Sequence, residues 1–133
     1  MRSIQTLIHA VVTVVVALTA LSGCGPSSSS KYEFSTTNSE IVMGGDTVID
    51  VQLSQKGKPV ADAVIFETRF DMGPDGMGGM MAEVTAQGSP RPGTYRFAVK
   101  PTMEGRWELE LGVKIQGEAE TVRASVIVTA LSK

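Results

Sequence analysis

The stretch "GRWELELGVKIQG", residues 105–117, decides the fold of this chain. Every second side chain in it is large and apolar: Trp107, Leu109, Leu111, Val113 and Ile115. Charged side chains stand between them: Arg106, Glu108, Glu110 and Lys114. A period of two places alternate residues on opposite faces of a β-strand, and no helical period explains it. The stretch therefore predicts a strand with one face in a core and one in solvent.

Four further stretches repeat this alternation. Their inward residues are expected to be Tyr95, Phe97 and Val99; Ile49, Val51 and Leu53; Val64, Phe66 and Phe70; and Val122, Ala124, Val126 and Val128. Segments rich in glycine or proline separate the stretches, at 55–59, 88–93, 101–105 and 116–120. About seven short strands in some hundred residues predict an all-β fold, an immunoglobulin-like antiparallel β-sandwich. We expect Trp107, Tyr95, Phe97 and Phe66 to anchor its core.

Residues 1–23 have the features of a signal peptide, because a basic Arg2 precedes an apolar run too short to span a bilayer comfortably. The run ends in "LSGC", residues 21–24, which resembles the lipobox of bacterial lipoproteins. The resemblance implies that Cys24 is lipidated and becomes the first mature residue. The alternative is a free thiol, since no second cysteine could form an intramolecular disulfide with it.

We expect residues 24–31 to be the lipidated cysteine and a flexible polar linker, and residues 32–133 to be the folded domain. The protein would then be held in the bacterial cell envelope by its lipid. Gly25 stands where lipoproteins kept in the inner membrane have aspartate, which favours the outer membrane, facing the periplasm, in a Gram-negative host.

The composition argues against several functions. A formal net charge of -2 gives no basic surface for nucleic acid. The only histidine, His9, lies in the signal peptide, so the mature domain has neither a histidine base nor a histidine-built zinc site. We therefore expect a protein that is not an enzyme. Asp71 and Asp75 match two EF-hand positions, but the glutamate that ends such a loop is missing, and "DG" at 75–76 is better interpreted as a turn.

The methionine thioethers are the remaining candidate functional groups. The stretch "FDMGPDGMGGMM", residues 70–81, holds four of the seven methionines, and Met103 lies in the turn before residue 107. Thioethers are soft ligands suited to Cu(I), and glycines let the backbone fold tightly enough for several to converge. The candidate metal ligands are Met72, Met77, Met80, Met81 and Met103. Methionines also fill cores and make adaptable protein contacts. Of the loop methionines, only Met81 is expected as a possible core residue, and Met43 is expected to pack or to lie at a strand end.

Residues 64–113 resemble the YtkA-like domain, which is related to FixH-like proteins. The resemblance rests on "VIFETRFDMGPDGMGGMMAEV", "PGTYRFAV" and "MEGRWELELGV", in which "G-x-Y" precedes "M-x-G-x-W". It implies a small extracytoplasmic β-sandwich, found as lipoproteins or fused to efflux-pump adaptors, and often linked to copper or heavy-metal handling. The loop departs from the compact "M-P-x-M-x-M" form, because it is longer and spaced by glycine.

Two hypotheses follow. In the first, the protein is a lipid-anchored Cu(I) binder that uses three of the candidate thioethers. In the second, it is an interaction module without a metal, whose methionines dock on an efflux-pump, respiratory-complex or oxidase-assembly partner.

Overall fold

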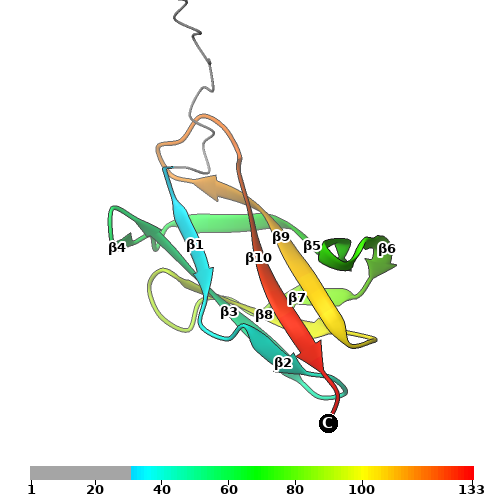
Figure 1. Ribbon diagram of the computed structural model, residues 1–133. Coiled ribbons are helices and arrows are strands. Elements are labelled where there is room, and N and C mark those ends of the chain that lie inside the picture. The colour runs from blue at the N-terminus through cyan, green and yellow to red at the C-terminus, as the bar shows by residue number, and fades with distance from the viewer. Residues whose placement is uncertain (1–30) are drawn as a thin grey trace, which may run out of the picture.

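A computed structural model describes residues 31–133, which form two β-sheets packed face to face (Figure 1). The first sheet holds β1 (Glu33–Thr36), β3 (Thr47–Gln55), β8 (Thr94–Lys100) and β7 (Glu83–Ala86) in that order, with β4 (Lys58–Pro59) beside β3. The second holds β2 (Glu40–Val42), β10 (Val122–Leu131), β9 (Gly105–Ile115), β5 (Ala63–Met72) and β6 (Met77–Met81). The all-β, immunoglobulin-like sandwich is thus confirmed.

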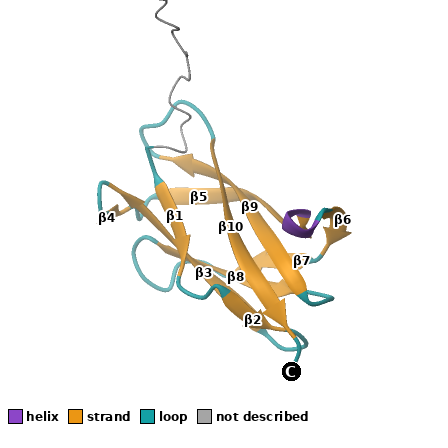
Figure 2. Cartoon of the chain, in the orientation of Figure 1, coloured by secondary structure: helices purple, strands orange, loops and turns teal. Residues whose placement is uncertain are grey.

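The strands differ from the prediction in their number and in the direction of one strand pair. Ten are present in the described part of the chain, because short strands such as β2 and β4 carry too few residues to show alternation. All pair antiparallel except β2 with β10, which is a parallel pair. The one short helix of residues 31–133 is η2 (Gly73–Asp75), a 3₁₀ turn between β5 and β6 (Figure 2).

The core lies between the sheets and is built from the alternating residues. Trp107 and Phe97 are fully buried and Tyr95 is nearly so, as predicted. The rings of Trp107 and Phe70 stack with centroids 4.9 Å apart and planes at 23°. The Trp107 indole Nε1–H donates to the carbonyl of Met103 at 3.0 Å, which satisfies its polar atom inside the core. Trp107 therefore joins the core to the turn that begins β9.

The prediction that Val64 and Phe66 face the core is wrong. Their side chains are 62% and 51% exposed. In the β5–β9 ladder Ile65 lies opposite Val113, but Glu67 lies opposite Gly112, so Phe66 is an extra residue in a β-bulge. The bulge shifts the alternation by one residue, and Phe66 turns outward over Gly112, where an added Cβ would come within 3.0 Å of its ring.

The start of the described chain packs on the far end of the second sheet. The Tyr32 hydroxyl donates to Glu118 at 2.6 Å, and the Lys31 ammonium contacts the same carboxylate. Glu118 lies in the turn between β9 and β10, at the opposite end of β9 from Gly105. Among residues 31–133, no helix has the length and apolar character that crossing a bilayer requires. The signal-peptide, Cys24 and linker predictions for positions 1–30 lie outside the described residues.

Candidate methionine site

The predicted methionine loop is a hairpin that extends the second sheet. β5 runs to Met72, η2 turns the chain, and β6 returns as the edge strand (Figure 1). In the register, Met72 lies opposite Met77, while its neighbour Asp71 lies opposite Met81. Residues 78–80 therefore bulge out of the ladder between two positions that face adjacent residues of β5.

The hairpin turn is held against the start of β9 by Asp75. Its carboxylate accepts hydrogen bonds from the backbone N–H of Arg106 at 2.7 Å and from the Arg106 Nε at 2.8 Å. The same guanidinium donates to the carbonyl of Pro74 at 2.8 Å. The backbone N–H of Arg106, followed by its side chain, holds the pKa of Asp75 below its usual value. The predicted turn at 75–76 is confirmed, because Gly76 ends η2 in the left-handed conformation.

Gly105 makes this close approach possible. Its φ of 130° lies outside the range that other residues adopt readily. An added Cβ would lie 2.6 Å from both Asp75 Oδ2 and the Met72 methyl carbon. The glycine of the "M-x-G-x-W" motif therefore leaves space for the hairpin turn and for Met72 at the same time.

A second carboxylate supports the base of the hairpin. Asp71 is only 3% exposed, and it accepts hydrogen bonds from Arg69 Nε at 2.5 Å and from the Gly73 N–H at 2.7 Å. Burial alone would raise the pKa of Asp71, but the hydrogen bonds from Arg69 and Gly73 outweigh it and lower the pKa. Arg69 also donates to the carbonyl of Gly78 at 2.9 Å, which fixes the bulge of β6. Both aspartates therefore have protein donors as partners.

The candidate ligands fall into three environments. Met72 is 1% exposed and belongs to the core, with its methyl carbon against Gly105. Met103 is half-buried and packs on the core, as Met43 does. Met77, Met80 and Met81 are 39%, 42% and 58% exposed on the edge strand. The hairpin thus places three exposed methionines on one edge strand and buries Met72 in the core.

The expectation about core methionines is wrong for Met72 and for Met81. Met72 is a core residue because β5 continues two residues past Phe70, and the alternation carries on with it. Met81 lies at the sheet edge, where no strand covers it. A signal for the first was present, since residues 70 and 72 have the same parity.

Comparison with protein families gives one assignment. Residues 27–112 match the YtkA-like family. The chain belongs to the YtkA-like family. The matched range contains the whole methionine hairpin, Met103 and Trp107. No curated protein matches the chain.

Two solved structures are similar to this YtkA-like chain. The filamin domain of Lin-41 is 20% identical, with a TM-score of 0.45, over 76% of this chain and 92% of that one. The C-terminal domain of ZirS is 10% identical, with a TM-score of 0.44, over 98% of this chain and 87% of that one.

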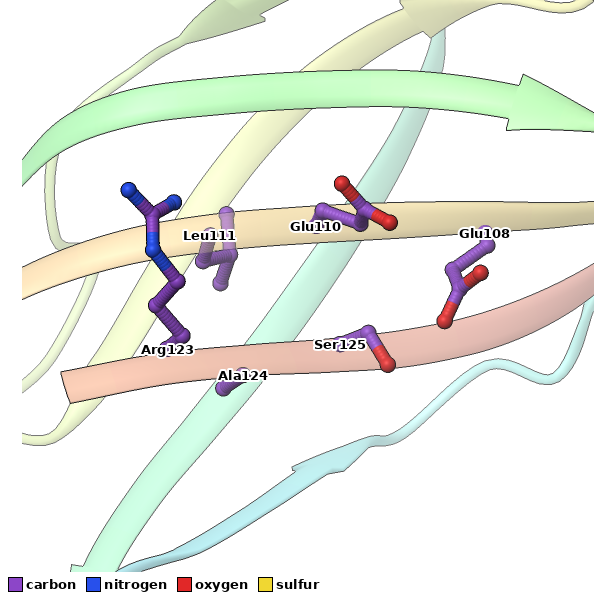
Figure 3. A pocket seen from close by; sticks show the side chains of 6 residues that line it. All are labelled: Glu108, Glu110, Leu111, Arg123, Ala124 and Ser125. Carbon is purple, nitrogen blue, oxygen red and sulfur yellow. The ribbon is translucent and has the colours of Figure 1, made fainter. Parts of the chain in front are cut away.

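The outer face of β9 in the YtkA-like domain carries charged residues, as predicted. A shallow hollow of about 410 Å³ lies there, lined by Glu108, Glu110, Leu111, Arg123, Ala124 and Ser125 (Figure 3). Arg123 pairs with Glu67 at 2.8 Å. Within the described chain, no three histidine, cysteine or acidic side chains are grouped in a way that could hold a metal ion.

Proposed function

We propose that this YtkA-like protein is a Cu(I)-binding protein of the bacterial cell envelope, and that Met77, Met80 and Met81 hold the ion. One observation carries the proposal: three thioethers stand within five residues of an edge strand, and each is substantially exposed. Thioethers are neutral and soft, so they favour Cu(I) over calcium, magnesium or zinc. A solvent-facing position leaves their sulfur atoms free to reach an ion.

The register of the hairpin supports convergence of these ligands. Four residues of extended strand span about 13 Å. Met77 and Met81 lie opposite adjacent residues of β5, so the bulge between them brings their backbones closer than that. Gly78 and Gly79 lie within the bulge, and they add no side chain that could obstruct the ion.

The ligand set of the proposal is smaller than the five methionines that the sequence suggested. Met72 fills the core, and moving its thioether to the surface would leave a cavity beneath Gly105. Met103 packs on the core, and its backbone carbonyl accepts the hydrogen bond from the Trp107 indole. We keep Met103 as an auxiliary ligand to be tested, and we assign Met72 a structural role.

The proposal includes the location and the kind of activity. The protein binds and hands over an ion rather than catalysing a reaction, and it does not bind nucleic acid. A lipid on Cys24 would hold it in the envelope, at the outer membrane of a Gram-negative host, where an efflux-pump or oxidase-assembly protein could exchange copper with it.

The test is a competition for Cu(I) between the full chain, purified in detergent, and a chromophoric chelator. His9→Ala and Cys24→Ser are present in all samples, because imidazole and thiol groups would bind copper themselves. We expect the chain to withdraw Cu(I) from the chelator, and the Met77→Leu/Met80→Leu/Met81→Leu variant to lose this ability. Met72→Leu is the matched control and should retain it. Equal competition by the triple variant would refute the proposed ligand set.

A second candidate is an interaction module that docks through the same strand without a metal. The exposed methionines of an edge strand favour it, since they offer adaptable apolar contact. Under this alternative the triple leucine variant keeps its partner in a pull-down from envelope extracts, whereas Met77→Glu loses it. If the wild-type chain binds Cu(I) and the triple leucine variant does not, the result supports the Cu(I)-binding function over the interaction module.

A further inference from the structure

The methionines of this domain differ in their access to oxidants. Met77, Met80 and Met81 are 39–58% exposed, whereas Met72, in the same hairpin, is 1% exposed. The rate at which a thioether is oxidised follows its exposure to the oxidant. One hairpin thus holds three reactive thioethers and one protected thioether.

The exposed methionines can accept a polar oxygen without disturbing the fold. They lie on the outermost strand of their sheet, and the hydrogen bonds that hold β6 come from backbone groups and Arg69 rather than from sulfur atoms. A sulfoxide there remains in water. At Met72 the same oxygen would lie in the core against Gly105, where a polar atom without a partner is destabilising.

We propose that Met77, Met80 and Met81 form a reversible oxidation site at which hypochlorous acid converts the thioethers to sulfoxides, so that the protein loses Cu(I) while its fold stays intact. The regulatory half of this proposal rests on the proposed function. In each step the oxidant transfers its oxygen atom to sulfur. The sulfur loses two electrons, and the chlorine leaves as chloride together with the proton of the acid.

Oxidation changes the ligand in the direction that disfavours Cu(I). One of the two sulfur lone pairs forms the new bond to oxygen, and the oxidised, electron-poor sulfur is a weaker donor through the pair that remains. The oxygen of a sulfoxide is a harder ligand than the thioether, and Cu(I) prefers soft ligands. Methionine sulfoxide reductases reverse the reaction, so the site can be restored.

The experiment uses the full chain with His9→Ala and Cys24→Ser, treated with increasing amounts of hypochlorous acid and then digested. The hairpin methionines all lie between Arg69 and Arg96, so one tryptic peptide contains the three exposed sulfurs and the buried one. Fragment ions of this peptide then report each residue separately. We expect Met77, Met80 and Met81 to be oxidised at doses that leave Met72 reduced, with unchanged Trp107 fluorescence and thermal midpoint.

The same samples are then titrated with Cu(I). Competition with the chelator should fall as the three sulfoxides accumulate, and treatment with sulfoxide reductases should restore it. Met77→Gln/Met80→Gln/Met81→Gln should copy the oxidised protein in folding normally and failing to compete. Met72→Gln is the contrasting variant and should unfold at lower temperature.

Each result decides one part of the proposal. Oxidation of Met72 together with the other three, or unfolding at the dose that modifies them, overturns the modification site. Unchanged Cu(I) competition after complete oxidation of the three overturns the regulation. A chain that never competes for Cu(I) before treatment overturns the proposed function and its regulation, while the oxidation map still decides the site.

Discussion

The carboxylate of Asp75 accepts hydrogen bonds from the backbone and the guanidinium of Arg106, which lies 31 residues further along the chain. This contact attaches the turn of the methionine hairpin to the first residues of β9. Gly105, the first residue of β9, lies against Met72, and the Arg106 guanidinium also donates to the carbonyl of Pro74. The placement of the exposed methionines therefore depends on the start of a strand that is distant in sequence.

Replacing Gly105 tests this placement. Gly105→Ala puts a Cβ within 2.6 Å of Asp75 and Met72 at a φ of 130°. We expect a loss of about 1–3 kcal/mol of unfolding free energy, which is typical of a side chain forced into a strained conformation. Urea denaturation measures it, and hydrogen exchange should show faster exchange of β6 amides. Gly79→Ala, where an added Cβ meets nothing within 4 Å, is the control and should leave both unchanged.

The core assignments of two aromatic residues predict opposite outcomes. Trp107→Ala should cost about 3–5 kcal/mol, because the ring is fully buried against Phe70. Phe66→Ala should cost well under half of that, because Phe66 is 51% exposed at the bulge. Both values follow from chemical denaturation. A larger loss for Phe66 than for Trp107 would contradict the bulge.

The methionines of the hairpin should differ in their effect on stability. Met72→Ala should cost about 2–5 kcal/mol, as removal of a buried side chain does. Met81→Ala should change the unfolding free energy by no more than about 0.5 kcal/mol, which is usual for a surface position. Thermal and urea unfolding of the two variants provide the comparison, and equal losses would contradict the burial difference.

Acid should weaken the attachment of the hairpin. The pKa values of Asp71 and Asp75 are lowered in the folded protein, so folding favours their ionised forms. The two carboxylates contribute fully to the free energy of unfolding above the ordinary carboxylate pKa of about 4. This stabilisation is lost as the pH falls through their lower pKa values in the folded protein. Urea midpoints from pH 7 to pH 2 should therefore fall in acid. Asp71→Asn/Asp75→Asn should have a lower midpoint at pH 7 and a smaller fall.

Much of the fold follows from local pattern. Alternation identified β3, β8, β9 and β10 because each keeps one face buried or half-buried along its length, and it identified the aromatic anchors Trp107, Tyr95 and Phe97. It failed in β5, where one extra residue reversed the faces of Val64 and Phe66. A bulge depends on the register with the partner strand, and a period of two along one strand contains no information about that register.

The sequence predicted where the candidate site lies along the chain better than it predicted which of its methionines are buried and which are exposed. The sequence by itself determined that the thioethers gather in residues 72–81, that glycines separate them, and that a turn occurs at 75–76, because residue type and local conformational preference decide these features. Only the tertiary structure decided that Met77, Met80 and Met81 are exposed at a free edge, and that Met72, which has the same parity as Phe70, lies in the core. That division follows from the end of β5, the free edge of the sheet and the contact of Asp75 with Arg106, all of which join residues through pairing and packing across the chain.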